Sequence, residues 1–173
     1  MRKKLRITRG IIILLNPTIS DIWLSPRLLL AFGFGSGCSS VAPGTIGTMA
    51  AIPLWYLASD FSISSYIVLV YVAFAMGCFV CSYAEKKVNE PDHKGIVWDE
   101  FVGFWITMST APVSWTGLAV GFFLFRILDI VKPWPISWID RNIHGGIGIM
   151  LDDVVAGVFA ASVIWVLRAI HFL

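Results

Sequence analysis

The stretch from residue 94 to residue 134 consists of two apolar segments, with charged residues only towards its outer ends. Pro112 lies in a short turn between two predicted helices, residues 96–111 and 115–132. A turn this short places two consecutive helices side by side and antiparallel. We therefore expect a helical hairpin whose charged residues gather at one end.

Four charged residues lie at equal distances from the turn of this hairpin. Asp99 and Glu100 precede the turn by about thirteen residues, and Arg126 and Asp129 follow it by about as many. At a rise of about 1.5 Å per residue, all four fall at one level. Arg126 and Asp129 are three residues apart and share a helix face. Because buried carboxylates are costly unless they are paired or bound to metal, this level is a candidate functional site.

The composition indicates an integral membrane protein with one compact bundle. Of the 173 residues, 57% are hydrophobic and only 14% are charged, whereas a soluble domain carries about 25% charged residues. The sequence predicts an all-α fold, a polytopic membrane bundle with about five crossings. The expected crossings are residues 44–59, 63–84, 96–111, 115–132 and 147–170.

Two N-terminal segments precede these crossings. Residues 1–27 form a basic leader, predicted to be cytoplasmic. Residues 28–34 are too short an apolar run to span, and they lead into a glycine-rich block at residues 33–48. A re-entrant or interfacial segment is therefore expected over residues 28–43. We expect residues 28–173 to form a single membrane-embedded domain.

The distribution of Lys and Arg predicts the orientation of this bundle. The leader and the two polar loops, residues 85–95 and 133–146, carry ten Lys and Arg residues, and the turns near Asp60 and Pro112 carry none. Lys and Arg favour the cytoplasmic side of a membrane. The N-terminus is therefore expected in the cytoplasm and the C-terminus outside, and the basic residues indicate no nucleic-acid partner.

With this orientation, the buried and loop-edge charges all fall on the cytoplasmic side. They are Asp99, Glu100, Arg126, Asp129, Lys132, Asp140, Arg141, His144, Asp152 and Asp153. Carboxylate oxygens are the ligands that Mg²⁺ prefers, and Arg and Lys neutralise phosphate. Intramembrane salt bridges are the alternative for any single pair. Several acids converging at one depth favour a metal-dependent phosphate site.

Four blocks of the sequence, in order, resemble the phosphatidylglycerophosphatase A family. They are GFGSG…PGTIGT (residues 33–48), IVWDEFVG (96–103), FRILDIVKPWPI (125–136) and DRNIHGGIGIMLDDVVAG (140–157). The resemblance implies Mg²⁺-dependent removal of the terminal phosphate from phosphatidylglycerophosphate, which leaves phosphatidylglycerol. It also implies a multi-pass protein of the bacterial inner membrane with its active site facing the cytoplasm.

The matching motifs imply roles for individual residues. Catalysis is assigned to Asp99, Glu100, Asp129 and Asp153, with Glu100 as a further metal candidate or as the base that positions water. The metal ligands are expected among Asp99, Asp129, Asp152 and Asp153. The substrate-binding candidates are Arg126, Lys132, Arg141, His144, Gly44 and Thr45. The glycine-rich block either binds phosphate through backbone N–H groups or only lets backbones pack closely.

A small transporter or proton-coupled carrier is the alternative function, because buried acids beside an arginine can relay protons. The clustering of the acids at one face of the membrane favours the phosphatase. The sequence leaves open the number of metal ions, the nucleophile, the selectivity among lipid phosphates and the oligomeric state.

Overall fold

The computed structural model describes residues 5–8, 11–14 and 19–173, so the predicted leader lies partly outside the described residues. Its elements, in order, are β1 (Leu5–Thr8), β2 (Ile11–Leu14), α1 (Ile19–Trp23), α2 (Pro26–Ala31), η1 (Gly33–Cys38), α3 (Pro43–Ala58), α4 (Ile63–Val88), α5 (Trp98–Met108), α6 (Trp115–Val131), α7 (Ile136–Asn142) and α8 (Gly145–Ala169).

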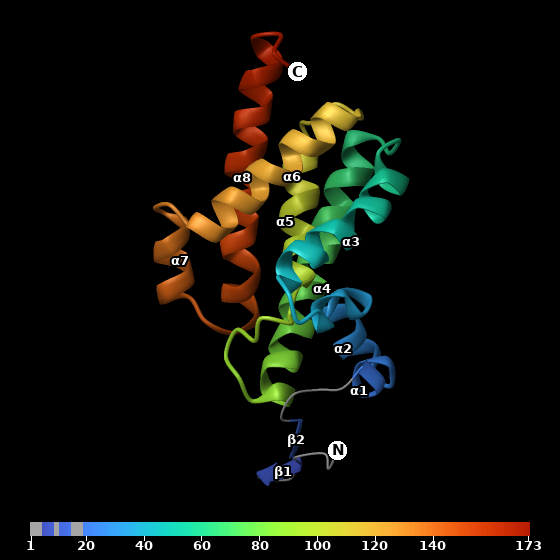
Figure 1. Ribbon diagram of the computed structural model, residues 1–173, viewed down its shortest axis with the longest axis vertical. Helices are drawn as coiled ribbons and strands as arrows, with labels where there is room; N and C mark the ends of the chain where they lie inside the picture. Colours follow the sequence, from blue (N-terminus) through green and yellow to red (C-terminus); the bar gives the residue numbers. More distant parts are fainter. Residues whose placement is uncertain (1–4, 9–10, 15–18) are drawn as a thin grey trace.

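The body of the protein is a bundle of helices, as predicted (Figure 1). The long helices run alternately up and down, and the C-terminus lies at the end of the bundle opposite β1. Strands β1 and β2 form an antiparallel hairpin beyond the lower end, which the sequence reasoning did not predict. The glycine-rich segment is neither one long helix nor an extended loop. It comprises α2, the short helix η1 and a loop that leads into α3.

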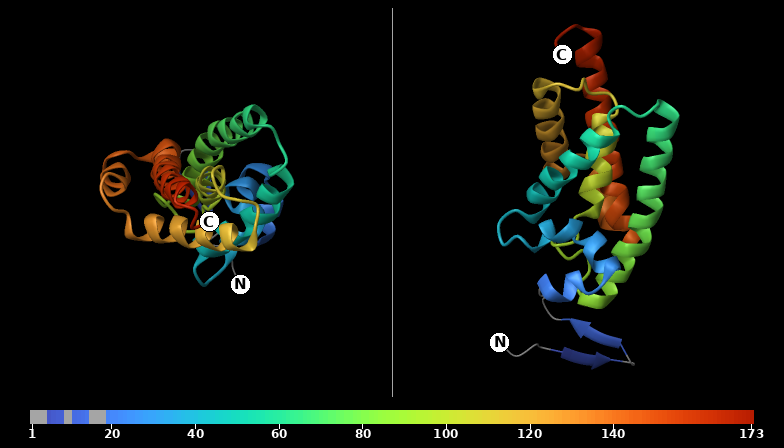
Figure 2. Two further views of the ribbon diagram at one scale, coloured as in Figure 1. Left: turned by 90° about the horizontal axis from the view of Figure 1, so that it is seen from above. Right: turned by 90° about the vertical axis from the view of Figure 1, so that its right-hand side faces the viewer.

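Helix α5 lies at the centre of the bundle and packs against α3, α4, α6 and α8. Figure 2 shows this arrangement from above and from the side. Two tryptophans fix α5 to its neighbours by hydrogen bonds. The indole of Trp98 donates to the Ala73 carbonyl on α4 at 3.0 Å, and that of Trp105 donates to the Ala51 carbonyl on α3 at 3.1 Å. These bonds satisfy the two polar groups that the buried aromatic rings carry.

Glycines bring α5 and α8 into close contact. A Cβ atom on Gly157 of α8 would overlap the Gly103 carbonyl of α5, and one on Gly103 would lie 2.7 Å from the Asp153 carbonyl. Small residues at such a crossing let helix backbones approach closely. The crossing places Asp153 one turn of α8 from the contact point and Glu100 about one turn of α5 from it.

The predicted helical hairpin is confirmed, and its boundaries follow local chemistry. Ser114 caps α6 by accepting a hydrogen bond from the Gly117 N–H at 3.0 Å. Lys132 ends α6 with a left-handed backbone, at φ 44°. The loop predicted at residues 133–146 contains α7, because Pro135 stands at the N-cap, where a proline does not disturb a helix.

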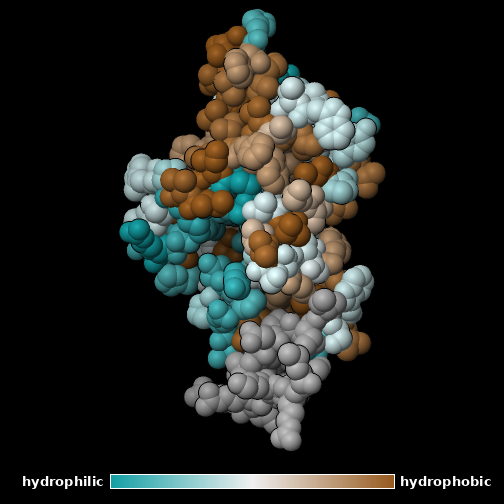
Figure 3. Space-filling view, in the orientation of Figure 1, coloured by the Kyte–Doolittle hydropathy of each residue, from teal (hydrophilic) through white to brown (hydrophobic). Residues whose placement is uncertain are grey.

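Two helices, α4 and α8, are long and apolar enough to cross a membrane. Helices α3 and α6 have 16 and 17 residues, and α5 has 11, so all three are shorter than a standard span. The two long helices suggest membrane association, whereas the five predicted crossings stay a prediction. Figure 3 shows a largely hydrophobic surface over the upper bundle and hydrophilic residues lower down, around α7.

Candidate active site

Glu100, on the first turn of α5, is the centre of one polar cluster. Its side chain is buried, with 8% of the residue exposed. Atom Oε2 accepts hydrogen bonds from Nη1 of Arg126 on α6 and from the hydroxyl of Thr48 on α3, the latter at 2.6 Å. The predicted alignment of the hairpin charges at one level is therefore confirmed for Glu100 and Arg126.

Arg126 connects Glu100 to a second carboxylate. Its Nη1 lies 2.8 Å from Oδ2 of Asp129, one turn further along α6, which confirms that the two residues share a helix face. Gly44, at the start of α3, lies directly against this pair. A Cβ atom there would overlap the Glu100 carboxylate and come within 3.1 Å of Nη2 of Arg126. Any larger residue would therefore require Glu100 or α3 to move.

A second cluster is centred on Lys132, at the end of α6. Its ammonium donates to Asp140 of α7 and to Oδ2 of Asp152 on α8, the latter at 2.6 Å. Lys132 therefore places a positive charge at the junction of three helices.

Asp99 and Asp153 complete the group of acids. Asp99 is half-buried on the first turn of α5, where its Oδ1 accepts the Glu100 N–H at 3.0 Å. Asp153 is only 3% exposed. The charges of Asp129 and Asp99, together with those of Glu100 and Asp152, all act on Asp153. The acids of α5, α6 and α8 therefore repel one another across a single buried region.

Three buried polar atoms in this region have no hydrogen-bond partner within the described part of the chain: Nε of Arg126, Oδ1 of Asp152 and Oδ2 of Asp153. Unsatisfied groups of this kind are costly in a folded protein. Two of them are carboxylate oxygens, which a cation would satisfy, and one is a guanidinium N–H, which an anion would satisfy.

The donor set fits Mg²⁺ in chemistry, since it offers carboxylate oxygens only. Across residues 5–8, 11–14 and 19–173, however, no three His, Cys, Asp or Glu side chains converge closely enough to hold a metal ion. The predicted ligands Asp99, Asp129, Asp152 and Asp153 thus lie in one region without forming a closed coordination shell.

The remaining predicted residues lie at the edge of the region. Arg141 is exposed in the last turn of α7, and His144 is exposed at the N-cap of α8. His144 lines a small cavity, of about 70 Å³, together with Asp92, Asp140 and Asp152. Thr45 is half-buried, next to Gly44 on α3. None of these residues belongs to the Glu100 cluster.

The sequence reasoning missed Thr48. It is fully buried and donates to Glu100, although its hydroxyl also lies 3.0 Å from the Gly44 carbonyl. A hydroxyl has one proton, and the shorter, charge-assisted contact to Glu100 is the stronger bond. The available signal was its spacing from Gly44, four residues or about one helical turn.

Comparison with known proteins identifies the family of this chain. The model of the family "Phosphatidylglycerophosphatase A" matches residues 29–168. Phosphatidylglycerophosphatase A of Escherichia coli K12 is 49% identical over 142 residues, which cover 82% of this chain and 83% of that protein. Phosphatidylglycerophosphatase A of Haemophilus influenzae is 39% identical over 155 residues, which cover 88% of this chain and 95% of that protein.

A third relative, from Bacteroides thetaiotaomicron, carries the provisional name phosphatidylinositol-3-phosphatase. It is 38% identical over 156 residues, which cover 82% of this chain and 92% of that protein. No solved structure matches the chain. The relatives favour a phosphatase over the transporter alternative. The family model spans most of the chain, including both polar clusters, and the chain therefore belongs to the phosphatidylglycerophosphatase A family of phosphatases.

Proposed function

We propose that this protein hydrolyses the terminal phosphate monoester of phosphatidylglycerophosphate, that the reaction depends on Mg²⁺, and that it takes place at the cytoplasmic face of the inner membrane. The names of the relatives support the substrate. The observation that carries the Mg²⁺ dependence is a pair of buried carboxylate oxygens, Asp152 Oδ1 and Asp153 Oδ2, for which residues 5–8, 11–14 and 19–173 provide no hydrogen-bond partner.

Asp99, Asp129, Asp152 and Asp153 would hold the metal ion. Such an ion, when bound, supplies Lewis-acid polarisation of the phosphoryl group and compensates the charge of the acids. Asp152 is fixed by its bond to Lys132 through Oδ2, so its Oδ1 stays available to a ligand. Asp153 is held in place by the close contact between α5 and α8 at Gly103.

Arg126 and Lys132 would bind the phosphate oxygens. Each already pairs with two carboxylates, Arg126 with Glu100 and Asp129, and Lys132 with Asp140 and Asp152. These bonds hold both cations in position before the substrate arrives, which lowers the cost of reorganisation. Nε of Arg126, which no described residue contacts by a hydrogen bond, offers an N–H to a phosphate oxygen. Arg141 and His144 would contact the substrate from the exposed edge, and Gly44 and Thr45 from the start of α3.

Glu100 would orient the attacking water and accept its proton. Arg126 and Thr48 hold its carboxylate in one orientation and stabilise the charged form. A base needs a fixed position within hydrogen-bond reach of the proton it takes. The positioning of Glu100 by two partners supports this role.

The membrane arrangement that we propose has five crossings, formed by α3, α4, α5, α6 and α8, with the N-terminus in the cytoplasm. The ends of these helices alternate between the two ends of the bundle (Figure 1). In Figure 1, residues 85–95 lie at the lower end of the bundle and α7 lies at its left side, in the lower half, and the Lys and Arg residues of these polar segments support a cytoplasmic location. Helix α3, about 24 Å long by its rise, would cross a locally thinned bilayer.

Phosphate release from phosphatidylglycerophosphate by the purified protein, with and without Mg²⁺, tests the proposal. We expect phosphate and phosphatidylglycerol as products, loss of activity in EDTA, and recovery when Mg²⁺ is restored. Unchanged activity in EDTA would refute the metal dependence. Absence of hydrolysis with Mg²⁺ present would refute the substrate assignment.

A further inference from the structure

Arg27 of α2 lies over two aromatic rings of α4. The Cζ atom of its guanidinium is 5.3 Å from the ring centroid of Phe79 and 5.0 Å from that of Tyr83. Phe79 and Tyr83 are four residues apart and share one face of α4, the helix against which α2 packs (Figure 1). Aromatic rings attract a cation placed over them. The two rings therefore hold the guanidinium of Arg27 on the side of the bundle.

The N–H groups of this guanidinium are available to a ligand. Arg27 is exposed, and no carboxylate among residues 5–8, 11–14 and 19–173 forms an ion pair with it. Arg126 and Lys132, by contrast, each pair with two carboxylates. A ring that stacks on a guanidinium covers its planar face and leaves the N–H groups on its edge open to oxygen atoms. Arg27 is thus a positioned cation to which the described chain supplies no counter-ion.

Lys87 adds a second positive charge on the same face of α4. It follows Tyr83 by four residues and lies about 6 Å further along the helix. The acid of this turn, Glu85, lies on a different face, where it lines the small cavity at the start of α8. We call the surface formed by Arg27, Phe79, Tyr83 and Lys87 the α2–α4 basic surface.

The α2–α4 basic surface lies at the end of the apolar part of α4. Residues 63–84 carry no charge, and at about 1.5 Å per residue they extend for about 33 Å. The hydrocarbon core of a bilayer is about 30 Å thick. If α4 crosses the membrane, Tyr83 lies where hydrocarbon meets headgroups, a depth at which tyrosine is common. Arg27 and Lys87 then lie at the level of the lipid phosphates.

We propose that the α2–α4 basic surface binds the phosphodiester of an anionic phospholipid in the leaflet at the lower end of the bundle. The edge of the Arg27 guanidinium binds two phosphate oxygens, and Lys87 supplies the second positive charge. Basic residues at this depth attract anionic lipids. Phosphatidylcholine binds less well, because its own cation comes close to both basic residues. The proposal goes beyond the proposed reaction and requires, of the proposed function, only that α4 crosses the bilayer.

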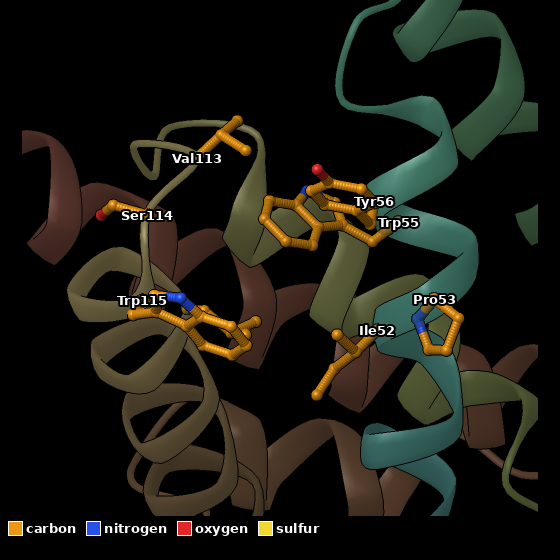
Figure 4. Close-up of a pocket in the computed structure, with 8 residues that line it drawn as sticks. Ile52, Pro53, Trp55, Tyr56, Val113, Ser114 and Trp115 are labelled. Carbon is orange, nitrogen blue, oxygen red and sulfur yellow. The ribbon is translucent and has the colours of Figure 1, made fainter.

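An apolar cavity towards the opposite end of the bundle provides a reference region. It has a volume of about 470 Å³, and the residues that line it include Ile52, Trp55 and Tyr56 of α3 and Trp115 and Leu118 of α6. Figure 4 shows the rings of Trp55 and Tyr56 facing Trp115 across the gap. No charged residue is among the described residues that line this cavity. Lipids that enter it should therefore not be distinguished by their headgroups.

Photolabelling in lipid nanodiscs tests the α2–α4 basic surface on the wild-type protein. The nanodiscs consist of phosphatidylcholine with a small fraction of a lipid that carries a diazirine near the carbonyl of one acyl chain. This lipid is phosphatidylglycerol in one sample and phosphatidylcholine in the other. Phosphatidylglycerol should label α2 and residues 79–87 at least about fivefold more strongly, the effect of one basic residue near an anionic lipid surface. Both lipids should label residues 52–56 and 115–118 equally.

Identifying the labelled residues by mass spectrometry separates this surface from the active site, which would also bind phosphatidylglycerol as a product. Equal labelling of residues 79–87 by the two lipids in the wild-type protein would overturn the proposal. This comparison requires no variant, so it stands even where a substitution prevents folding.

Two variants test the roles of the individual cations. Arg27→Met keeps an apolar side chain on the two rings and removes the charge, so the preference for phosphatidylglycerol at residues 79–87 should fall below about twofold. Lys87→Met should reduce it as well. Arg168→Met, which removes an exposed arginine near the other end of the bundle, is the matched control and should keep the wild-type preference. A preference that persists in both Arg27→Met and Lys87→Met would overturn the proposal.

The labelling experiment involves no hydrolysis, so its result is separate from that of the phosphatase assay. A wild-type protein that prefers phosphatidylglycerol at residues 79–87 but releases no phosphate would support this surface and refute the proposed reaction. Normal phosphate release together with equal labelling by the two lipids would refute this surface alone.

Discussion

The hydroxyl of Thr48 on α3 lies 2.6 Å from the carboxylate of Glu100 on α5, although 52 residues separate the two in the sequence. This bond, together with Arg126, fixes the orientation of Glu100 at the level where three helices meet. It also links the glycine-rich N-terminal block to the acidic residues of the hairpin, which the sequence pattern left unconnected.

Replacing Thr48 by valine keeps the shape of the side chain and removes its proton. We expect Thr48→Val to lower the free energy of unfolding by about 1–3 kcal/mol, because the buried carboxylate loses a donor. Phosphate release should fall as well, since Glu100 is less well held. Unfolding in detergent and the rate of phosphate release measure the two effects. Thr48→Ser restores the hydroxyl, and if it behaved like the valine variant, the hydrogen bond would not be the cause.

Substitution of Gly44 should disturb the ionic cluster directly. In Gly44→Ala, the added methyl group overlaps the Glu100 carboxylate, so either α3 or Glu100 has to move. We expect phosphate release to fall by about 100-fold, the effect of a small misplacement of a reacting group. Leu57→Ala, at an exposed position near the other end of α3, is the control, because Leu57 lies away from the cluster. Normal turnover of Gly44→Ala would show that the Gly44 contact is not needed for the reaction.

The hairpin, and the common height at which its charged residues lie, were predictable because both follow from helix geometry. The rise per residue relates Glu100 to Arg126, and the spacing of three relates Arg126 to Asp129. The position of Thr48 was not predictable, since it depends on how α3 packs against α5. Helix α7 was missed because the prolines that precede it are equally typical of loops and of helix starts.

The location of the polar loops can be tested with accessible tags. The Lys and Arg residues at the lower end of the bundle predict that residues 85–95 lie in the cytoplasm and that Leu173 lies outside. A tag after Leu173 should react with a membrane-impermeant reagent on intact spheroplasts, and a tag in the loop should react only after permeabilisation. A cytoplasmic C-terminus would contradict five crossings.

Removing charge from the proposed metal ligands should weaken Mg²⁺ binding. Asp99→Asn, Asp129→Asn and Asp153→Asn keep the size of each side chain, and the acids around Asp153 repel one another without a cation. We therefore expect a higher Mg²⁺ concentration for half-maximal activity and little loss of folded protein. Asp60→Asn, exposed at the opposite end, should behave like the wild type. Normal activity of all three variants at limiting Mg²⁺ would exclude this carboxylate site.

Arg126→Lys distinguishes phosphate binding from metal binding. A guanidinium can bind two oxygens at once, and Arg126 also has an N–H, at Nε, that has no partner in the described chain. A lysine keeps the charge but cannot bind two oxygens at once in this way, so transition-state stabilisation should fall by about 2–4 kcal/mol. Added Mg²⁺ should not restore the rate, whereas it should partly restore that of Asp129→Asn. A full Mg²⁺ titration of both variants makes the comparison, with Arg168→Lys, on an exposed residue of α8, as the control. Normal turnover of Arg126→Lys would reduce Arg126 to a structural partner of Glu100 and Asp129 and leave Lys132 as the main phosphate contact.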